Sequence, residues 1–492
     1  MVIFFTFALI FLYLDHSLGA LPTNIKQELE PIYKATSADQ AHDIWNDHLI
    51  RDKQYKELDQ IWTDVDNQRS DLTAEVMEYL HKNEMKDKSF VMASTSLFIE
   101  LAMVCLGAGG ETLKQCNGIL GKGAPAEVIH VIYHMISKHQ MDQTNTQFKL
   151  RLLNLIYVDK TFPLKKDCEE GFNKIFAPSE IHNVSFATHN DVVARAKDIN
   201  DQGRNHCEME QLVTESELEN TVMLLISAVR FSGKWVTPFP KVEDQKFTNE
   251  KGEVTQVRMM TGIEQEMIYD ETDDYQMVAL PYNTSGEEHL APYLVIYLPK
   301  EHKTVTQVLE KLKSGGKLVN TFQGKLTSYF GKELVKLSIP EIAIDNKVHL
   351  EDAMKALGFK NGFSAKGPNK ADFKNLSEKG EETYISAWWQ DIFIKVDKTG
   401  TEGGTNNAQY SGMRSARGLA PPKPKPFTAN RPFLYMVADG FGNIILNGIF
   451  MGEKMKEKKP EAQKPNAAEA PKPKDAQNSN GAKKPVAGKP GK

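Results

Sequence analysis

A segment of about thirty residues, from Asp397 to Phe427, holds the side chains best suited to chemistry with a partner. Its first half is small and polar, and its second half is rich in proline and therefore extended. Such a length is unusual for a plain connection, and an exposed extended loop is what a protease active site accepts. Within it Arg414 precedes Ser415, and a trypsin-like pocket with a carboxylate at its base binds arginine. The segment predicts a cleavable Arg414–Ser415 bond, with Arg417 as the fallback and a flexible linker as the alternative interpretation.

The remainder of the chain shows no local set of catalytic residues. It has no GxSxG, no phosphate-binding glycine loop, no HExxH and no CxxC, and its 13 histidines are scattered. We therefore expect no catalytic residue, no metal site and no cofactor, and a protein that is not an enzyme.

The composition indicates a large folded protein. The chain has 492 residues, of which 40% are hydrophobic and 25% are charged, so most of it can bury a core. Its 60 basic and 65 acidic residues give a net charge of −5, which gives no indication of nucleic-acid binding. Four cysteines are too few for a disulfide scaffold.

The two ends of the chain differ from its body. Residues 1–14 are apolar but shorter than a membrane span, and small residues follow at Ser17, Gly19 and Ala20. We interpret residues 1–20 as a signal peptide and expect a secreted, extracellular protein without a membrane span. Residues 453–492 contain 11 lysines but only five acidic residues, which is typical of a disordered basic tail. The tail is either a solvated appendage or a tether to an acidic partner.

In a secreted protein cysteines can form disulfides and sequons can carry glycans, so both are considered. Cys105 lies in an apolar run and is interpreted as a small core residue. A bridge between Cys168 and Cys207 is compatible with their polar surroundings, but four cysteines allow three complete pairings and the sequence does not select one. Three sequons, each expected to carry a glycan if exposed, begin at Asn183, Asn283 and Asn375.

Hydrophobic periodicity predicts the elements that position the long loop. Helices come first and strands dominate later, which indicates an α+β fold with large sheets. The expected helices are residues 72–82, 94–107 and 349–357. The expected strands are residues 221–230, 276–280, 293–298, 335–344, 393–396, 433–437 and 444–450. Residues 21–70 are polar with scattered aromatic side chains and are treated as an N-terminal extension.

From residue 70 to residue 453 the chain resembles the serpin family at many points. Each motif is weak alone, but their number, order and spacing agree with the family's pattern. The matching stretches are Leu106–Thr112 (the family's LGAxGxT turn), Ile199-Asn200, Phe231–Phe239 (FxGxWxxxF), Leu280–Tyr282 (LPY), Pro340–Ile342, Leu357-Gly358, Ala371–Phe373, Phe427–Phe433 (FxAxxPF) and Phe450–Gly452 (FMG).

The resemblance implies a serpin-like domain over residues 71–452, with about nine helices around three β-sheets. An exposed reactive-centre loop is implied at about residues 398–426. After cleavage, the N-terminal half of such a loop enters the central sheet as a new strand, and the acylated protease is trapped by this suicide-substrate mechanism. The implied partner is a secreted trypsin-like serine protease, and the chain is expected to be a monomer.

The resemblance also implies a hinge at the start of this loop. The family's GTEAAA pattern corresponds to Gly400, Thr401, Glu402, Gly403, Gly404 and Thr405. Serpins usually place the cleaved residue fourteen positions after the first glycine, and that position is Arg414. The family's spacing therefore selects the same bond as the local sequence.

A polar gate beneath the central sheet departs from the family's pattern, as does the hinge. The gate positions are Ala93, Ser96, Ser227 and Gln390, and only Ser96 has the family's residue type. Gly403, Gly404, Asn406 and Asn407 stand where alanine and threonine are usual, and glycine and asparagine are poor strand formers. If alternate residues from Thr401 face inward, Asn407 becomes buried and needs polar partners. These departures leave open a non-inhibitory serpin that acts as a carrier, chaperone-like or structural secreted protein.

Overall fold

The computed structural model describes residues 55–121, 148–284, 291–328, 330–401 and 423–452. The second range has short gaps between residues 167 and 178. A few single helical residues between 129 and 136 are described in addition. Residues 1–455 cluster as one compact unit and residues 456–492 as another. The expected signal peptide, the first part of the extension, the loop from residue 402 to residue 422 and the basic tail lie outside the described residues.

The helices surround and support the sheets. They are α4 (Tyr55–Leu80), α5 (Ser94–Gly107), α6 (Gly110–Gly121), α9 (His189–Gln202), α10 (Glu215–Leu218), α11 (Val305–Leu312), α12 (Lys317–Leu326) and α13 (Glu351–Ala356). Short π- or 3₁₀-helical segments are η2 (His81–Met85), η3 (Gly203–Cys207) and η5 (Asn361–Phe363). The sequence of α5 is apolar on all sides, which is typical of a helix enclosed by the core, and nearly all of its residues are buried.

A central sheet of six strands has the order β10-β11-β12-β4-β2-β3. Its strands are β2 (Phe148–Asp159), β3 (Glu180–Val184), β4 (Met223–Lys234), β10 (Ile342–His349), β11 (Ile385–Asp397) and β12 (Gly400–Thr401). β4 and β11 are parallel and pair directly along most of their length. The two-residue β12 lies between them at one end.

The remaining described strands form one sheet of nine. They are β1 (Phe90–Met92), β5 (Lys241–Thr248), β6 (Val254–Glu271), β7 (Tyr275–Pro281), β8 (Tyr293–Pro299), β9 (Lys332–Pro340), β13 (Lys425–Thr428), β14 (Phe433–Ala438) and β15 (Ile444–Phe450). β6 is long and has a register shift between Met260 and Ile263. It pairs with β5 near its start and with β7 at its end. Hydrogen bonding therefore joins two of the three expected sheets into one.

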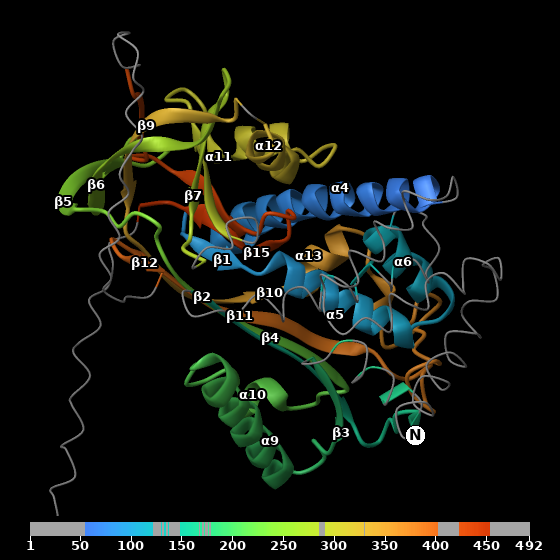
Figure 1. Cartoon of the computed structure of the whole chain (residues 1–492). Coiled ribbons are helices and arrows are strands. Elements are labelled where there is room, and N and C mark those ends of the chain that lie inside the picture. The colour runs from blue at the N-terminus through green and yellow to red at the C-terminus, as the bar shows by residue number, and fades with distance from the viewer. Residues whose placement is uncertain are drawn as a thin grey trace, which may run out of the picture. The chain divides into compact units, whose positions relative to one another are not determined.

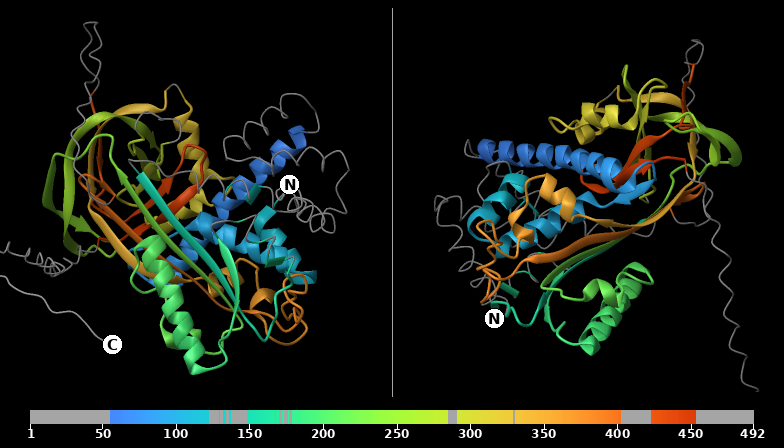
Figure 2. Two further views of the ribbon diagram at one scale, coloured as in Figure 1. Left: turned by 60° about the horizontal axis from the view of Figure 1, so that its bottom comes forward. Right: turned by 180° about the vertical axis from the view of Figure 1, so that it is seen from behind.

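Two hydrophobic cores lie on opposite faces of the central sheet. The larger core contains α5 and the inward side chains of the nine-stranded sheet. The smaller core packs α9 against β2 and β4. Figure 1 shows α5 and α9 on opposite sides of β2, β4 and β11, and the two further views in Figure 2 agree. A strand entering this sheet would therefore have a hydrophobic core on each side over part of its length.

The structure confirms several expected elements and changes others. The helix expected at residues 94–107 is α5, and the last two strands lie where the pattern placed them. The first expected helix begins at Tyr55 instead of Leu72, so part of the expected extension belongs to α4. The strand expected at residues 335–344 is two strands in different sheets, because Glu341 turns away to hydrogen-bond Arg258 through its backbone N–H.

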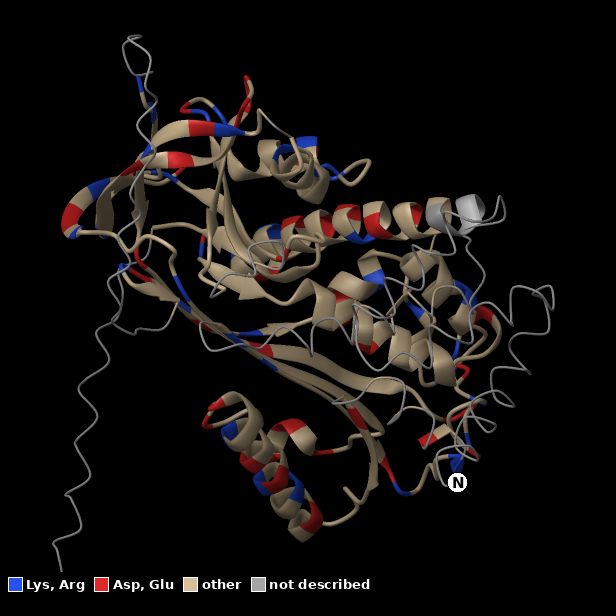
Figure 3. Ribbon diagram, in the orientation of Figure 1, with Lys and Arg blue, Asp and Glu red and all other residues tan. Residues whose placement is uncertain are grey.

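Charged residues are distributed over most elements, and acidic residues recur along α4 (Figure 3). Across the described part of the chain, no helix is long and apolar enough to cross a membrane.

Candidate functional site

The hinge enters the central sheet at the junction between β4 and β11, which we call the seam. The two residues of β12 pair with Val396 and Asp397 of β11 and with Gly233 and Lys234 of β4. The pairing is antiparallel on both sides. β12 is therefore the first rung of a strand between β4 and β11, and it consists of the first two residues of the predicted hinge, Gly400 and Thr401.

Thr401 is fully buried, as expected for an inward-facing residue. Its hydroxyl shares a 2.8 Å hydrogen bond with the hydroxyl of Tyr282. The Tyr282 ring stacks on Trp235, with centroids 4.6 Å apart. The indole N–H of Trp235 in turn donates to the carbonyl of Asp397 at 2.9 Å. An aromatic cluster thus holds the entry of the loop in place.

Gly400 is required at this entry by its backbone geometry. Its φ is +149°, and a Cβ at this position would lie 2.1 Å from the carbonyl oxygen of Gly233. Any side chain here would break the pairing between β12 and β4.

The four predicted gate residues lie at the N-terminus of α5 and on the two seam strands. Gln390 of β11 forms two hydrogen bonds with Ala93: its Oε1 accepts from the backbone N–H and its Nε2 donates to the carbonyl, both at 3.0 Å. Ser227 of β4 is the direct pairing partner of Gln390 across the seam. Gln390 thus ties α5 to β11 at the level where the two strands meet.

Ser96 connects the same helix to β2. Its hydroxyl donates to Oδ1 of Asn154 at 2.8 Å, and Nδ2 of Asn154 donates to Ser179 at 3.2 Å. Asn154 and Ser179 thus extend the hydrogen bonds of the predicted gate residue Ser96, and the sequence did not identify them. Asn154 is a single polar residue within the apolar run of β2, and this was the available signal.

Glu100 is a third residue that the sequence did not identify. It is fully buried in α5, and the indole N–H of Trp388 on β11 donates to its Oε2 at 2.8 Å. Burial raises the pKa of Glu100 to about 8, whereas the hydrogen bonds from Trp388 and Ser227 act in the opposite direction. Its Oε1 and the hydroxyl of Ser227 have no hydrogen-bond partner that meets normal geometry. The signal that could have identified Glu100 is its position as a charged residue within the apolar sequence of α5.

The opposite face of the seam is covered by charged and aromatic side chains. The guanidinium of Arg230 on β4 lies over the ring of Phe393 on β11, at 5.4 Å from the centroid. Lys347 of β10 forms a 2.8 Å ion pair with Glu217 of α10. Beside it, burial raises the pKa of Asp391 to about 7, with Lys347 lowering it. These contacts cross the closed seam and would have to change if a strand entered.

The remaining hinge residues, Glu402, Gly403, Gly404 and Thr405, lie outside the described residues, as do Arg414, Ser415 and Arg417. The structure therefore gives no geometry for the predicted cleavage bond.

The three sequons lie in partly buried positions. Nδ2 of Asn183 donates to the carbonyls of Val158, Asp159 and Phe162, and Nδ2 of Asn375 donates to the carbonyl of Ala108 at 2.8 Å. The backbone N–H of Asn283 donates to Lys234 beside the hinge. A glycan attached to Nδ2 of Asn183 or Asn375 would thus replace an N–H that donates a hydrogen bond to a backbone carbonyl.

The cysteines pair differently from the bridge considered in the sequence. Cys105 of α5 and Cys116 of α6 form a disulfide, with their Cα atoms 5.8 Å apart. Cys168 and Cys207 are buried and form no disulfide. Cys105 is therefore a buried core residue, but it also links two helices covalently.

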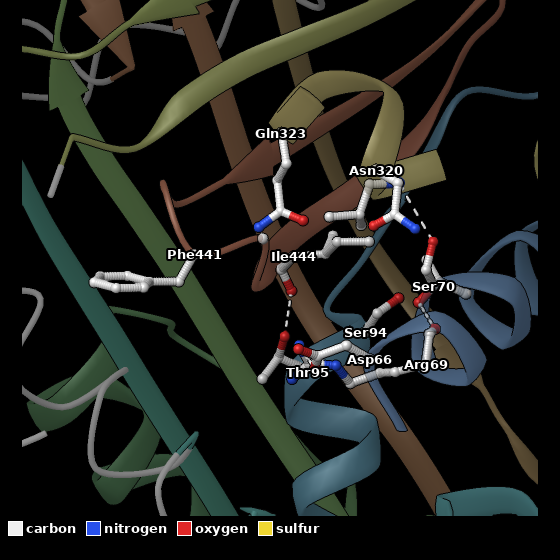
Figure 4. A pocket seen from close by; sticks show the side chains of 12 residues that line it. Asp66, Arg69, Ser70, Ser94, Thr95, Asn320, Gln323, Phe441 and Ile444 are labelled. Carbon is white, nitrogen blue, oxygen red and sulfur yellow. Dashed lines mark hydrogen bonds and ion pairs between the residues drawn. The ribbon is translucent and has the colours of Figure 1, made fainter. Parts of the chain in front are cut away.

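A small polar cavity lies between α4, α12 and the turn before β15 (Figure 4). Arg69 lines it and donates from Nη2 to Asp66 and to Asn443, both at 3.0 Å. The cavity volume is about 20 Å³, which suits a single water and is far below the several hundred Å³ typical of ligand pockets. Among the described residues, no group of His, Cys, Asp and Glu could hold a metal ion.

Comparison with known proteins agrees with this architecture. The chain matches the family model "Serpin (serine protease inhibitor)" over residues 67–456. An antitrypsin of Bombyx mori is 27% identical over 393 residues, covering 78% of this chain and 93% of that protein. The native structure of the thermophilic serpin tengpin is 25% identical, with a TM-score of 0.65 over 79% of this chain and 94% of that one.

A thyroxine-binding globulin in complex with thyroxine also has this fold. Its TM-score is 0.64 at 17% identity, and the match covers 79% of this chain and 99% of that one. Since the family model spans most of the sequence, and the described strands form the same fold as these structures, the chain belongs to the serpin family.

Proposed function

We propose that this serpin inhibits a secreted trypsin-like serine protease by a suicide-substrate mechanism. The protease cleaves the Arg414–Ser415 bond, the hinge side of the loop enters the central sheet, and the acylated protease is trapped. Arg414 supplies the side chain that the protease binds, and Ser415 is the first residue of the released side.

One observation carries this proposal: β12 already lies between β4 and β11 and pairs with both. The pairing of β12 already sets the register of a strand that continues from Thr401. Insertion of that strand therefore requires only that the direct hydrogen bonds between β4 and β11 break. Burial of such a strand between β4 and β11 stabilises the inserted state, since apolar surface leaves water while the backbone groups gain hydrogen bonds. The gain in stability is what drives the protease across the molecule.

The rest of the hinge is compatible with insertion. Gly403, Gly404 and Thr405 are small, and small residues can enter a packed sheet without a clash. Glu402 falls on the opposite face from Thr401, because side chains alternate along a strand.

The disulfide supports secretion. Disulfides persist in oxidising compartments, and the Cys105–Cys116 bridge lies in the larger hydrophobic core. We therefore keep residues 1–20 as a signal peptide and propose an extracellular monomer. The basic tail is proposed as either a solvated appendage or a tether to an acidic partner. Asn183, Asn283 and Asn375 remain proposed glycosylation positions, with Asn183 the least accessible through its three backbone bonds.

A non-inhibitory serpin is the second candidate, and the altered gate favours it. Gln390 holds Ala93 with two hydrogen bonds, so β11 is tied to α5 at the level where the seam must open. The cavity beside Arg69 gives no support to carriage of a hormone-sized ligand, because it has room for only about one water molecule.

The two candidates differ in the products of cleavage. An inhibitor forms a stable covalent complex with the protease, and its cleaved form melts at a higher temperature than the intact form. A non-inhibitory serpin is cleaved without a complex and without this rise. Electrophoresis in SDS and a melting scan of the cleaved chain together distinguish them.

A further inference from the structure

A polar hollow with a volume of about 520 Å³ lies where three connections between strands and helices meet. They are the turn from β5 to β6, the connection from β8 to α11 and the connection from β13 to β14. This volume is within the range of small-molecule sites. The described residues that line the hollow include none of the hinge, the gate or the seam strands. Its titratable side chains are Glu250, Glu301, His302, Lys303 and Arg431.

Arg431 is a partly buried cation whose hydrogen bonds go to neutral oxygens. Its Nε donates to the carbonyl of Pro299 at 2.6 Å, and its Nη1 donates to Oδ1 of Asn430 at 3.2 Å. Burial lowers the pKa of Arg431, and the charge of Glu301 acts in the opposite direction. A guanidinium that has lost part of its water normally pairs with an anion, and its planar fork fits a carboxylate. The anchored guanidinium therefore favours a carboxylate in the hollow.

Lys303, the other fixed cation, is already neutralised. Its Nζ lies 2.7 Å from Oδ1 of Asp274, and both side chains are about three-quarters buried, with exposed fractions of 27% and 23%. Lys303 therefore adds little to the attraction for an anion.

Glu250 places a carboxylate of fixed orientation in the same hollow. Its Oε1 accepts a 2.7 Å hydrogen bond from the backbone N–H of Val305, at the start of α11. Glu301 adds a second, exposed carboxylate. These two groups would repel a multiply charged anion, whereas Arg431 would repel a simple cation. A molecule that carries one carboxylate and one ammonium satisfies both signs.

We propose that this hollow binds a small zwitterion of the amino-acid class, with its carboxylate on Arg431 and its ammonium at Glu250. The site goes beyond the proposed protease inhibition and does not depend on loop insertion. Its ligand contacts come from three turns that the strands of the nine-stranded sheet and α11 hold together.

The test titrates the full-length chain at pH 7.4 with each of the common free L-amino acids and with the dipeptide alanylalanine. Saturation-transfer NMR detects binding, and calorimetry measures the affinity. We expect at least one of these zwitterions to bind. Acetylation of its amino group and amidation of its carboxyl should each weaken binding about tenfold, because each removes a charge-assisted hydrogen bond. Inorganic phosphate should bind more weakly than the zwitterion.

Two variants locate the site. Arg431→Gln should weaken binding of the zwitterion about tenfold and remove its advantage over the amidated form. Glu250→Gln keeps an acceptor for Val305, so the turn is retained even if Arg431→Gln disturbs its own surroundings. Glu250→Gln should remove the advantage of the free amino group over the acetylated one. Glu243→Gln on β5, outside the hollow, is the matched control and should leave the affinity unchanged.

Three results would overturn the proposal. If no amino acid and no alanylalanine binds, the hollow is not a zwitterion site. If binding is unchanged in both Arg431→Gln and Glu250→Gln, the ligand lies elsewhere on the chain. If phosphate or the acetylated form binds as tightly as the free zwitterion, the hollow recognises the anion alone and the assignment of Glu250 is wrong.

Discussion

The indole nitrogen of Trp388 donates a 2.8 Å hydrogen bond to the carboxyl of Glu100, joining the central helix α5 to seam strand β11 inside the core. Gln390, two residues along β11, binds the backbone of Ala93 at the start of the same helix. The helix therefore holds one side of the seam at two successive inward-facing positions. Any opening between β4 and β11 acts on these contacts.

The buried carboxyl predicts a pH dependence of stability. The pKa of Glu100 is raised from 4.5 to about 8 in the folded chain. Between these values the folded state keeps a proton that the unfolded state has lost, so stability falls as pH rises through this window. The loss of stability is absent below the pKa of Glu100 in the unfolded chain and is complete above its pKa in the folded chain. A shift of this size corresponds to an effect on the order of 3–5 kcal/mol.

Denaturant unfolding at pH 5, 6.5 and 8 measures this slope. Glu100→Gln should be more stable than the wild type at pH 8 and should lose the part of the slope that comes from Glu100, because the amide can still accept from Trp388 without ionising. Asp391 and Glu84 also have pKa values raised to about 7 and should leave a residual slope. An unchanged slope in Glu100→Gln would contradict the assignment.

The Cys105–Cys116 disulfide predicts sensitivity to reductant. It closes a loop with a sequence separation of 11, for which the loss of stability on reduction should be about 2–3 kcal/mol. Alkylation of the denatured chain should label two cysteines without reductant and four with it. Cys207→Ala, which removes a free thiol, is the control and should keep the reductant effect. Labelling of four cysteines without reductant would show that the bridge is absent.

Gly400 predicts a position-specific intolerance to side chains. Gly400→Ala places a Cβ against the carbonyl of Gly233 and should expel β12 from the seam. We expect faster hydrogen exchange at β12 and a smaller rise in melting temperature after cleavage of the loop. Gly118→Ala is the matched control: a Cβ at this position would have no atom within 4 Å, and in helix α6 it should be neutral or stabilising by up to about 1 kcal/mol. Equal behaviour of the two variants would refute the role of Gly400.

The hydrophobic pattern of the sequence was sufficient to predict the helices and strands that are apolar along their whole length. The unbroken apolar run of α5 and the late strands β14 and β15 could be predicted with nearly correct bounds because tertiary packing there agrees with local preference. β11 was expected only at residues 393–396, since Gln390 and Asp391 interrupt its apolar pattern. Gln390 binds the predicted gate residue Ala93, and Asp391 lies near Lys347 on the opposite face. The hydrophobic pattern therefore failed to predict the strand at the candidate site.

The candidate site could be placed in part through the family's motifs. Gly400, Thr401 and Gln390 lie where the motifs implied, but Glu100 and Trp388 belong to no motif. Their contact joins residues 288 apart in the sequence, and a long-range hydrogen bond leaves no local pattern. The cysteine pairing was equally hidden, because Cys105 and Cys116 come together only where α5 packs against α6.

Trapping by loop insertion is tested most directly by mixing the full-length chain with an excess of a trypsin-like protease and analysing the products in SDS. The account predicts a covalent band at the summed mass of the two proteins, which disappears in Arg414→Glu while Arg417→Glu retains it. Clean cleavage after Arg414 without such a band, and without a rise in the melting temperature of the cleaved chain, would contradict trapping by loop insertion.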